Sequence, residues 1–91
     1  MGTNKVTDEM IKDLYKLLAS IKTSEDFELL FSDLCTYKEI EQMAQRVLAA
    51  KLLMDGKTYN QVIEQTDISS ATLSRVSRCV QYGKGYKKFL K

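Results

Sequence analysis

The stretch YNQVIEQTDISSATLSRVSRCVQ, residues 59–81, gives the clearest indication of the fold of this chain. It contains two short segments in which apolar residues recur at helical spacing. Thr58 and Gln61 form a capping-box pattern before the first segment, and Ser69 or Ser70 can cap the second. The side chains expected to face inward are Val62, Ile63, Ile68, Leu73, Val76 and Val80. Two short helices joined by a tight turn in this way are typical of a helix-turn-helix.

The second predicted helix leaves a surface of small hydroxyl and apolar side chains near its N-terminus, followed by arginine. Such a surface fits a DNA major groove about 12 Å wide, where it can reach base edges and phosphates. We therefore predict a binding site for double-stranded DNA made of Asn60, Gln61, Ser69, Ser70, Ala71, Thr72, Ser74 and Arg78. The alternative is a helical protein-interaction adaptor whose polar helix faces solvent, because similar helical hairpins occur in proteins that never touch DNA.

The sequence of the remainder of the chain also predicts helices. It has no proline and only four glycines, and alternation typical of strands is rare. We expect a first helix with Thr7 as its N-cap and a second one after Thr23 or Ser24. The capping-box pattern TYKE, residues 36–39, opens a long third helix that should end at Asp55-Gly56. The predicted fold class is therefore all-α.

The second half of the long third helix is apolar on nearly every side. Between Val47 and Met54 only Lys51 is polar, so this segment should be surrounded by protein. A chain of 91 residues has difficulty supplying that cover alone, and a second copy is the simplest source. We predict a homodimer of a single domain, in which residues 1–57 form a helical dimerisation core, residues 58–82 the helix-turn-helix and residues 83–91 a C-terminal helical turn.

Charge is segregated along the chain. Residues 1–67 hold 12 acidic and 8 basic side chains, whereas residues 68–91 hold 6 basic and no acidic ones. A basic end on an acidic body favours a polyanionic partner such as DNA. For residues 84–91 a solvated tail is an equal alternative.

Composition argues against several other classes of protein. The chain has no histidine and two cysteines, so one copy cannot assemble an ordinary Cys/His zinc site or a Ser-His or Cys-His nucleophile pair. An enzyme that uses only carboxylates stays open as a weak alternative. No segment approaches the roughly 20 apolar residues that cross a bilayer, and the N-terminus lacks the pattern of a secretory signal. We expect a cytoplasmic protein without membrane contact.

The stretch from Leu34 to Leu90 resembles the Trp repressor family, and within it a Trp-repressor-like group of bacterial proteins. The segments that match are TYKEIEQMAQRV, LLMDGKTYNQVI and SSATLSRVSR. The turn around residues 67–70 is one residue shorter than in the Trp repressor. The resemblance implies an intertwined homodimer in which the N-terminal helices of both chains build the core. It also implies a sequence-specific transcriptional repressor that binds a palindromic operator.

The resemblance places the two arginines that sandwich tryptophan in that family on Arg46 and Arg75. Val76, however, stands where the Trp repressor has glycine, and Cys79 replaces a serine. We therefore expect no tryptophan corepressor and no cofactor; another small effector, or an internal brace made by the two arginines, remains an alternative. In the first helix of the helix-turn-helix, Gln61 replaces an arginine and Glu64 a lysine. The operator should accordingly differ, and this helix should add less affinity.

Overall fold

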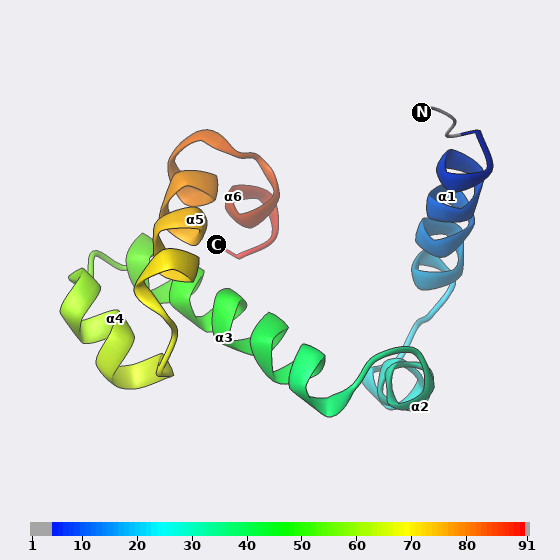
Figure 1. Cartoon of the computed structure of the whole chain (residues 1–91), viewed down its shortest axis with the longest axis horizontal. Coiled ribbons are helices and arrows are strands. Elements are labelled where there is room, and N and C mark those ends of the chain that lie inside the picture. The colour runs from blue at the N-terminus through cyan, green and yellow to red at the C-terminus, as the bar shows by residue number, and fades with distance from the viewer. Residues whose placement is uncertain (1–4, 91) are drawn as a thin grey trace. The chain divides into compact units, whose positions relative to one another are not determined.

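The computed structural model describes residues 5–90, and all the regular structure in this range is helical (Figure 1). The all-α prediction is confirmed. The helices are α1 (Lys5–Ala19), α2 (Ser24–Leu34), α3 (Tyr37–Met54), α4 (Tyr59–Thr66), α5 (Ser70–Tyr82) and α6 (Gly85–Phe89). By its internal contacts the chain divides after Thr36 into an N-terminal unit with α1 and α2 and a C-terminal unit with α3 to α6.

The N-terminal unit consists of two helices without a buried residue among those whose side chains are described. Helix α2 begins where expected, because the Thr23 hydroxyl accepts a hydrogen bond of 3.1 Å from the Asp26 N–H. Helix α1 begins at Lys5, so the prediction of Thr7 as its N-cap is wrong. Capping patterns locate a helix end only to within one or two residues, and the acidic Asp8 still lies in the first turn, where the helix dipole favours it.

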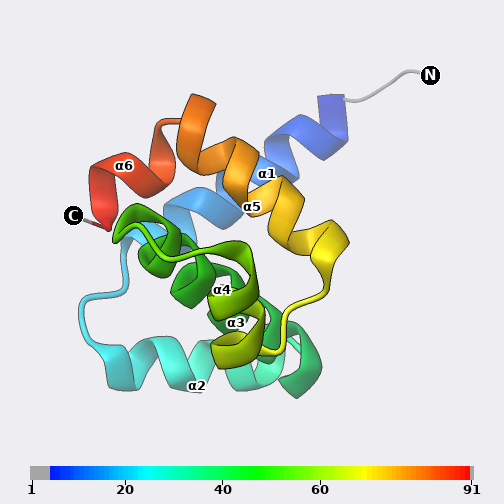
Figure 2. The same ribbon diagram turned by 90° about the vertical axis from the view of Figure 1, so that its left-hand side faces the viewer.

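The C-terminal unit is built on α3, against which α4 and α5 pack (Figures 1 and 2). Its buried core consists of Ala49, Ala50, Val62, Ile68, Leu73 and Val76. Two further side chains of the predicted inward set, Ile63 and Val80, pack against this core and are partly buried. The predicted apolar contact of the helix-turn-helix is thus present. Helix α6 lies beside the C-terminal end of α5, and its Tyr86 contacts the rim of the core.

Helix α3 ends with a Schellman motif, as its Asp55-Gly56 sequence predicts. The Lys57 N–H donates to the Leu52 carbonyl and the Gly56 N–H to the Leu53 carbonyl, both at 3.0 Å. Gly56 has φ +89°, a left-handed conformation that glycine adopts without steric cost. One chain does not surround α3 with protein as completely as expected, however, because Val47 and Leu48 remain 39% and 43% exposed.

Among residues 5–90, no helix is both long and apolar enough to cross a membrane. The same part of the chain contains no group of three or more Cys, Asp or Glu side chains placed to hold a metal ion.

Candidate nucleic-acid interface

Helix α4 starts with the complete capping box that the sequence predicts. The Thr58 hydroxyl accepts from the Gln61 N–H at 3.2 Å, and Gln61 Oε1 accepts from the Thr58 N–H at 2.9 Å. Both bonds satisfy N–H groups that the first helical turn leaves without a partner. They also engage the side-chain oxygen Oε1 of Gln61, so the amide N–H groups are the part of this side chain that stays available to a ligand.

The turn between α4 and α5 is closed by Thr66 and Asp67. The buried Thr66 hydroxyl donates to the Val62 carbonyl at 2.7 Å and accepts from the Ile68 N–H at 3.2 Å. Asp67 has φ 60° and ψ 23°, and its N–H donates to the Ile63 carbonyl at 2.8 Å. Aspartate is one of the few residues other than glycine that visit this left-handed region. The turn therefore forms without the glycine that is frequent at this place.

Ser69 caps α5 and also positions Thr72. Its hydroxyl accepts from the Thr72 N–H at 3.2 Å and donates to the Thr72 hydroxyl at 2.9 Å. The start of α5 therefore presents a hydrogen-bonded pair of hydroxyl groups. Of the two caps that the sequence left open, the structure selects Ser69.

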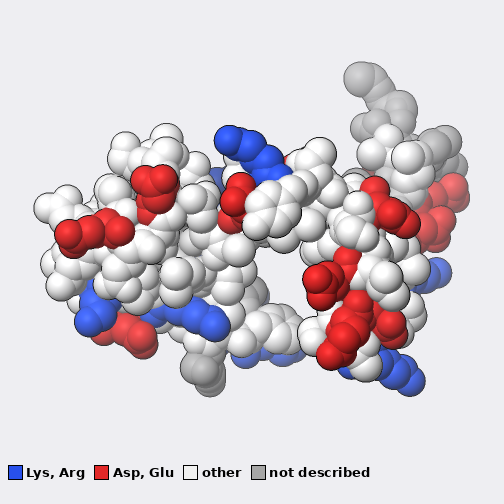
Figure 3. Space-filling view, turned by 90° about the horizontal axis from the view of Figure 1, so that it is seen from below, with Lys and Arg blue, Asp and Glu red and all other residues white. Residues whose placement is uncertain are grey.

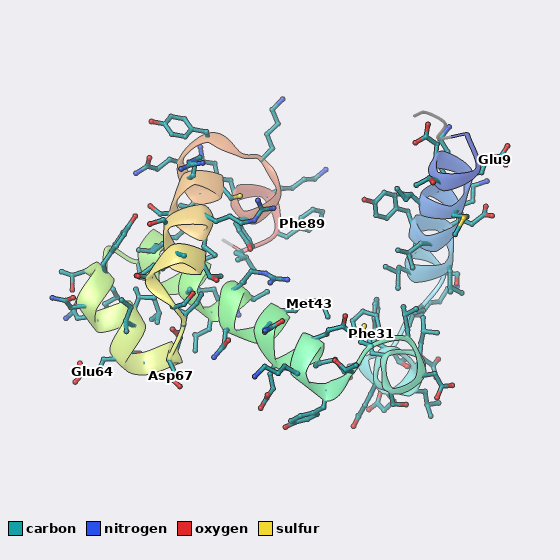
Figure 4. All side chains as sticks on the ribbon, viewed as in Figure 1. Glu9, Phe31, Met43, Glu64, Asp67 and Phe89 are labelled. Atoms are coloured by element: carbon teal, nitrogen blue, oxygen red, sulfur yellow. The ribbon has the colours of Figure 1, made fainter. Side chains whose placement is uncertain are left out.

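The structure leaves nearly all of the predicted DNA-contacting side chains at the surface. Thr72 is half-buried, whereas the other seven are exposed: Asn60, Gln61, Ser69, Ser70, Ala71, Ser74 and Arg78. On the opposite side of α5, Leu73 and Val76 point into the core and Ser77 is buried. Figure 4 shows Glu64 and Asp67 on the outer side of α4 and of the turn that follows it. This surface includes two acids, which reduces its attraction for phosphates.

Positive charge dominates the C-terminal unit. It holds 10 basic and 5 acidic residues, whereas the N-terminal unit holds 4 basic and 7 acidic ones. Figure 3 shows acidic side chains gathered on the surface of the N-terminal unit. Beyond α5, the ammonium group of Lys87 donates to the Gln81 carbonyl at 2.8 Å, and that of Lys88 lies 5.5 Å from the centre of the Phe89 ring. The Lys87 side chain thus links α6 to α5.

The two arginines that the resemblance assigns to a ligand are not brought together around one hollow. Half-buried Arg46 lines a polar hollow of about 550 Å³ between the first half of α3 and the start of α5, which Arg75 does not line. Within residues 5–90 neither guanidinium forms a hydrogen bond or an ion pair, so the alternative of an internal brace lacks the expected contacts. Val76 is 1% exposed and fills the core where the Trp repressor has glycine.

Sequence reasoning missed one contact of this site. The side-chain amide of Gln45, in the middle of α3, donates a hydrogen bond of 3.1 Å to the Thr66 carbonyl at the end of α4. The two residues are 21 positions apart, so no local pattern indicates their contact.

Comparison with known proteins identifies a matching family and a similar protein. A model of the Trp repressor protein family matches residues 9–91. The Bacillus subtilis protein YerC, itself uncharacterized, is 39% identical over 83 residues, which cover 91% of this chain and 80% of YerC.

Two solved structures are similar over nearly the whole chain. A candidate Trp repressor from Staphylococcus aureus has a TM-score of 0.84 and 30% identity, covering 99% of this chain and 90% of that one. A TrpR-like protein from Eubacterium eligens has a TM-score of 0.85 and 36% identity, covering 94% and 90%.

Proposed function

This chain belongs to the Trp repressor family of helix-turn-helix DNA-binding regulators, and from that premise we propose that it is a repressor that binds a palindromic operator as a homodimer. The family is regulatory and not enzymatic. The observation that supports DNA binding most strongly is the exposed surface of α5. It combines small side chains, a hydrogen-bonded hydroxyl pair and arginine, and it contains no carboxylate.

Within this surface we assign different roles to different side chains. The hydroxyl and methyl groups at the start of α5 contact base edges, since they are short enough to enter the groove. They belong to Ser69, Ser70, Ala71, Thr72 and Ser74. Arg78, two turns further along α5, contacts phosphates, and Asn60 and Gln61 contact the duplex from the start of α4. The base contacts select the sequence and the phosphate contacts supply affinity that does not depend on sequence.

The unpartnered apolar surfaces of both units support the homodimer. In the N-terminal unit Met10, Tyr15 and Leu29 are each more than 60% exposed. In the C-terminal unit an apolar hollow of about 480 Å³ opens beside Val47, Tyr86 and Leu90. The two units carry opposite net charge, so the N-terminal unit of one copy suits the C-terminal unit of another. Exposed apolar area of this kind is typical of interaction surfaces.

We further propose that residues 1–91 form one domain whose three segments have different roles. Residues 1–57 form the dimerisation core, residues 58–82 the helix-turn-helix and residues 83–91 the closing turn. The twofold axis places two copies of α5 about 34 Å apart, one turn of B-form DNA, which explains a palindromic operator. Repression then needs no tryptophan, because the buried Val76 side chain occupies the space that a glycine leaves free.

Selection of bound fragments from random duplex DNA tests this function. We expect the purified protein to enrich a palindrome, and its affinity for that duplex to fall steeply between low and moderate salt as counterions are released. Sedimentation of the complex should give two chains per duplex. Enrichment of no sequence, together with retention of a protein partner on the immobilised chain, would instead establish the adaptor alternative. A reporter placed behind the selected palindrome should lose expression when the protein is present.

A further inference from the structure

The Gln45 side chain links the core helix α3 to the end of the first helix of the helix-turn-helix. Its Nε2 donates to the Thr66 carbonyl at 3.1 Å; Thr66 is 8% exposed and Gln45 is half-buried. Thr66 is the last residue of α4, so its carbonyl is one of the acceptors that a helix leaves unpaired at its C-terminus. A buried carbonyl without a partner is costly, and Gln45 supplies that partner.

This bond lies at the turn before α5, so a change in the bond alters the orientation of α5. The Thr66 carbonyl belongs to the planar peptide that joins Thr66 to Asp67, the residue in the left-handed conformation. Rotation of that plane changes the direction in which the chain leaves α4, and Ser69 caps α5 only two residues later. Helix α5 has 13 residues and is therefore about 20 Å long, so a small rotation at the turn displaces its far end by several ångströms.

Other contacts of the turn act within the helix-turn-helix itself. The Thr66 hydroxyl bonds to Val62 and Ile68, and Asp67 bonds to Ile63, so these bonds shape the turn but do not tie it to α3. Apolar contact of Leu73 and Val76 with Ala49 and Ala50 holds α5 on α3, but apolar packing has little directional preference. A hydrogen bond is directional, and Gln45 provides one at this junction.

We propose that Gln45 is a positioning residue for operator recognition: by holding the Thr66 carbonyl it sets the orientation of α5 on α3, and through the dimer it sets the spacing of the two half-sites that the protein accepts. This inference rests on the proposed function. Gln45 itself touches no base or phosphate in this role. Its loss therefore changes which operator geometry is preferred and leaves the number of phosphate contacts unchanged.

Two substitutions remove the donor and nearly preserve the shape of the side chain, Gln45→Met and Gln45→Glu. The matched control is Gln42→Met, because Gln42 lies one turn earlier on α3, lines the same polar hollow as Gln45, and its side chain forms no hydrogen bond within the described residues. Binding is measured on the palindrome selected by the unchanged protein and on duplexes in which its half-sites are moved together or apart by one or two base pairs. Circular dichroism and thermal melting verify the fold of each variant.

We expect both Gln45 variants to bind the selected palindrome about fivefold more weakly, the effect of one lost hydrogen bond, and to discriminate less between spacings. For Gln45→Met, which adds no charge, affinity for unrelated duplex and the salt dependence of binding should stay at the unchanged protein's values, because phosphate contacts are intact. The Gln42 variant should match the unchanged protein throughout.

A folded Gln45 variant with the original spacing preference overturns the inference alone, as does an equal change in the Gln42 control. Failure of both Gln45 variants to fold also overturns it, because Gln45 then serves stability and not orientation. If the unchanged protein selects no duplex, the proposed function fails first and this inference fails with it.

Discussion

At the scale of single residues, the site depends on side chains that serve two purposes. Ser69 caps α5 and orients the Thr72 hydroxyl, and Gln61 completes the capping box of α4 while its amide N–H groups stay available for the proposed DNA contact. A capping bond restricts the rotamers of these side chains, which lowers the entropic cost of the proposed binding. Substitutions at these residues should therefore change both stability and recognition.

Substitution of Asp67 tests whether the turn requires a left-handed backbone conformation at this position. Replacement by valine should lower the free energy of unfolding by about 1–2 kcal/mol, since a β-branched residue is strained in the left-handed region. Asp67→Gly is the matched control and should leave stability equal or higher. Urea unfolding followed by circular dichroism measures both variants. Equal stability of the valine variant would show that the turn does not keep φ near 60°.

Arg78 and Ser74 separate the two proposed kinds of DNA contact. Arg78→Ala should weaken binding to every duplex and reduce the slope of log K against log salt by about 1.8 per dimer, because one phosphate contact is lost from each of the two subunits. Ser74→Ala should leave that slope intact and relax the preference at one base position in each half-site. Both side chains are exposed, so thermal stability should not change. A uniform loss caused by Ser74→Ala would reverse the assignment.

At the scale of helices, the ends of α5 differ in how they are held. Its N-terminus is capped by Ser69, while its C-terminus ends at Gly83, whose N–H donates to the Cys79 carbonyl at 2.8 Å. A Cβ at Gly83 would lie 2.6 Å from that carbonyl oxygen, closer than atoms tolerate. The absence of a side chain thus allows the chain to leave α5 and form α6 beside it.

Gly83→Ala is therefore expected to disturb the junction of α5 and α6. The carbonyl is backbone and cannot move aside, so we expect a loss of about 1–3 kcal/mol in the free energy of unfolding and weaker packing of Tyr86 and Leu90. Gly85→Ala serves as the control, because a Cβ there meets no atom within 4 Å. Denaturant unfolding of the two variants, with tyrosine fluorescence as a local probe, makes the comparison. Equal stability would contradict the steric argument.

At the scale of the whole molecule, the C-terminal unit has a compact core of six buried apolar residues, whereas the described part of the N-terminal unit has none. Large apolar side chains remain exposed in both units. A small chain that leaves so much apolar surface uncovered gains stability by association, and the proposed dimer supplies the missing cover.

Val47→Asp should separate the proposed dimer, since it places a charge at the apolar hollow where Val47 is 39% exposed. We expect sedimentation to report single chains, the melting temperature to fall and operator binding to be lost. Lys57→Asp, which makes its charge change at an exposed position after the end of α3, should leave the mass unchanged. For the unchanged protein, the melting temperature should rise with protein concentration. A single-chain mass for the unchanged protein would refute the dimer itself.

Much of the fold could be predicted from the sequence, because its signals are local. The ends of α2, α4 and α5 follow from Thr23, Thr58 and Ser69, each of which bonds to an N–H three residues away. The core of the helix-turn-helix follows from apolar spacing along two short segments. The prediction that Thr7 caps the start of α1 was wrong. A residue that can cap a helix can also lie inside one when the sequence around it favours a helix.

The sequence alone specifies the positions of most helices, the caps of α2 and α4 and the exposed surface of α5, because hydrogen bonds and apolar periodicity over three or four residues encode these features. Which distant side chains meet depends on the tertiary structure. Packing of the helices joins Gln45 to Thr66 and places Arg46 in a hollow that Arg75 does not line. Such contacts depend on how whole helices pack, and no spacing along the chain encodes the packing of residues about twenty positions or more apart.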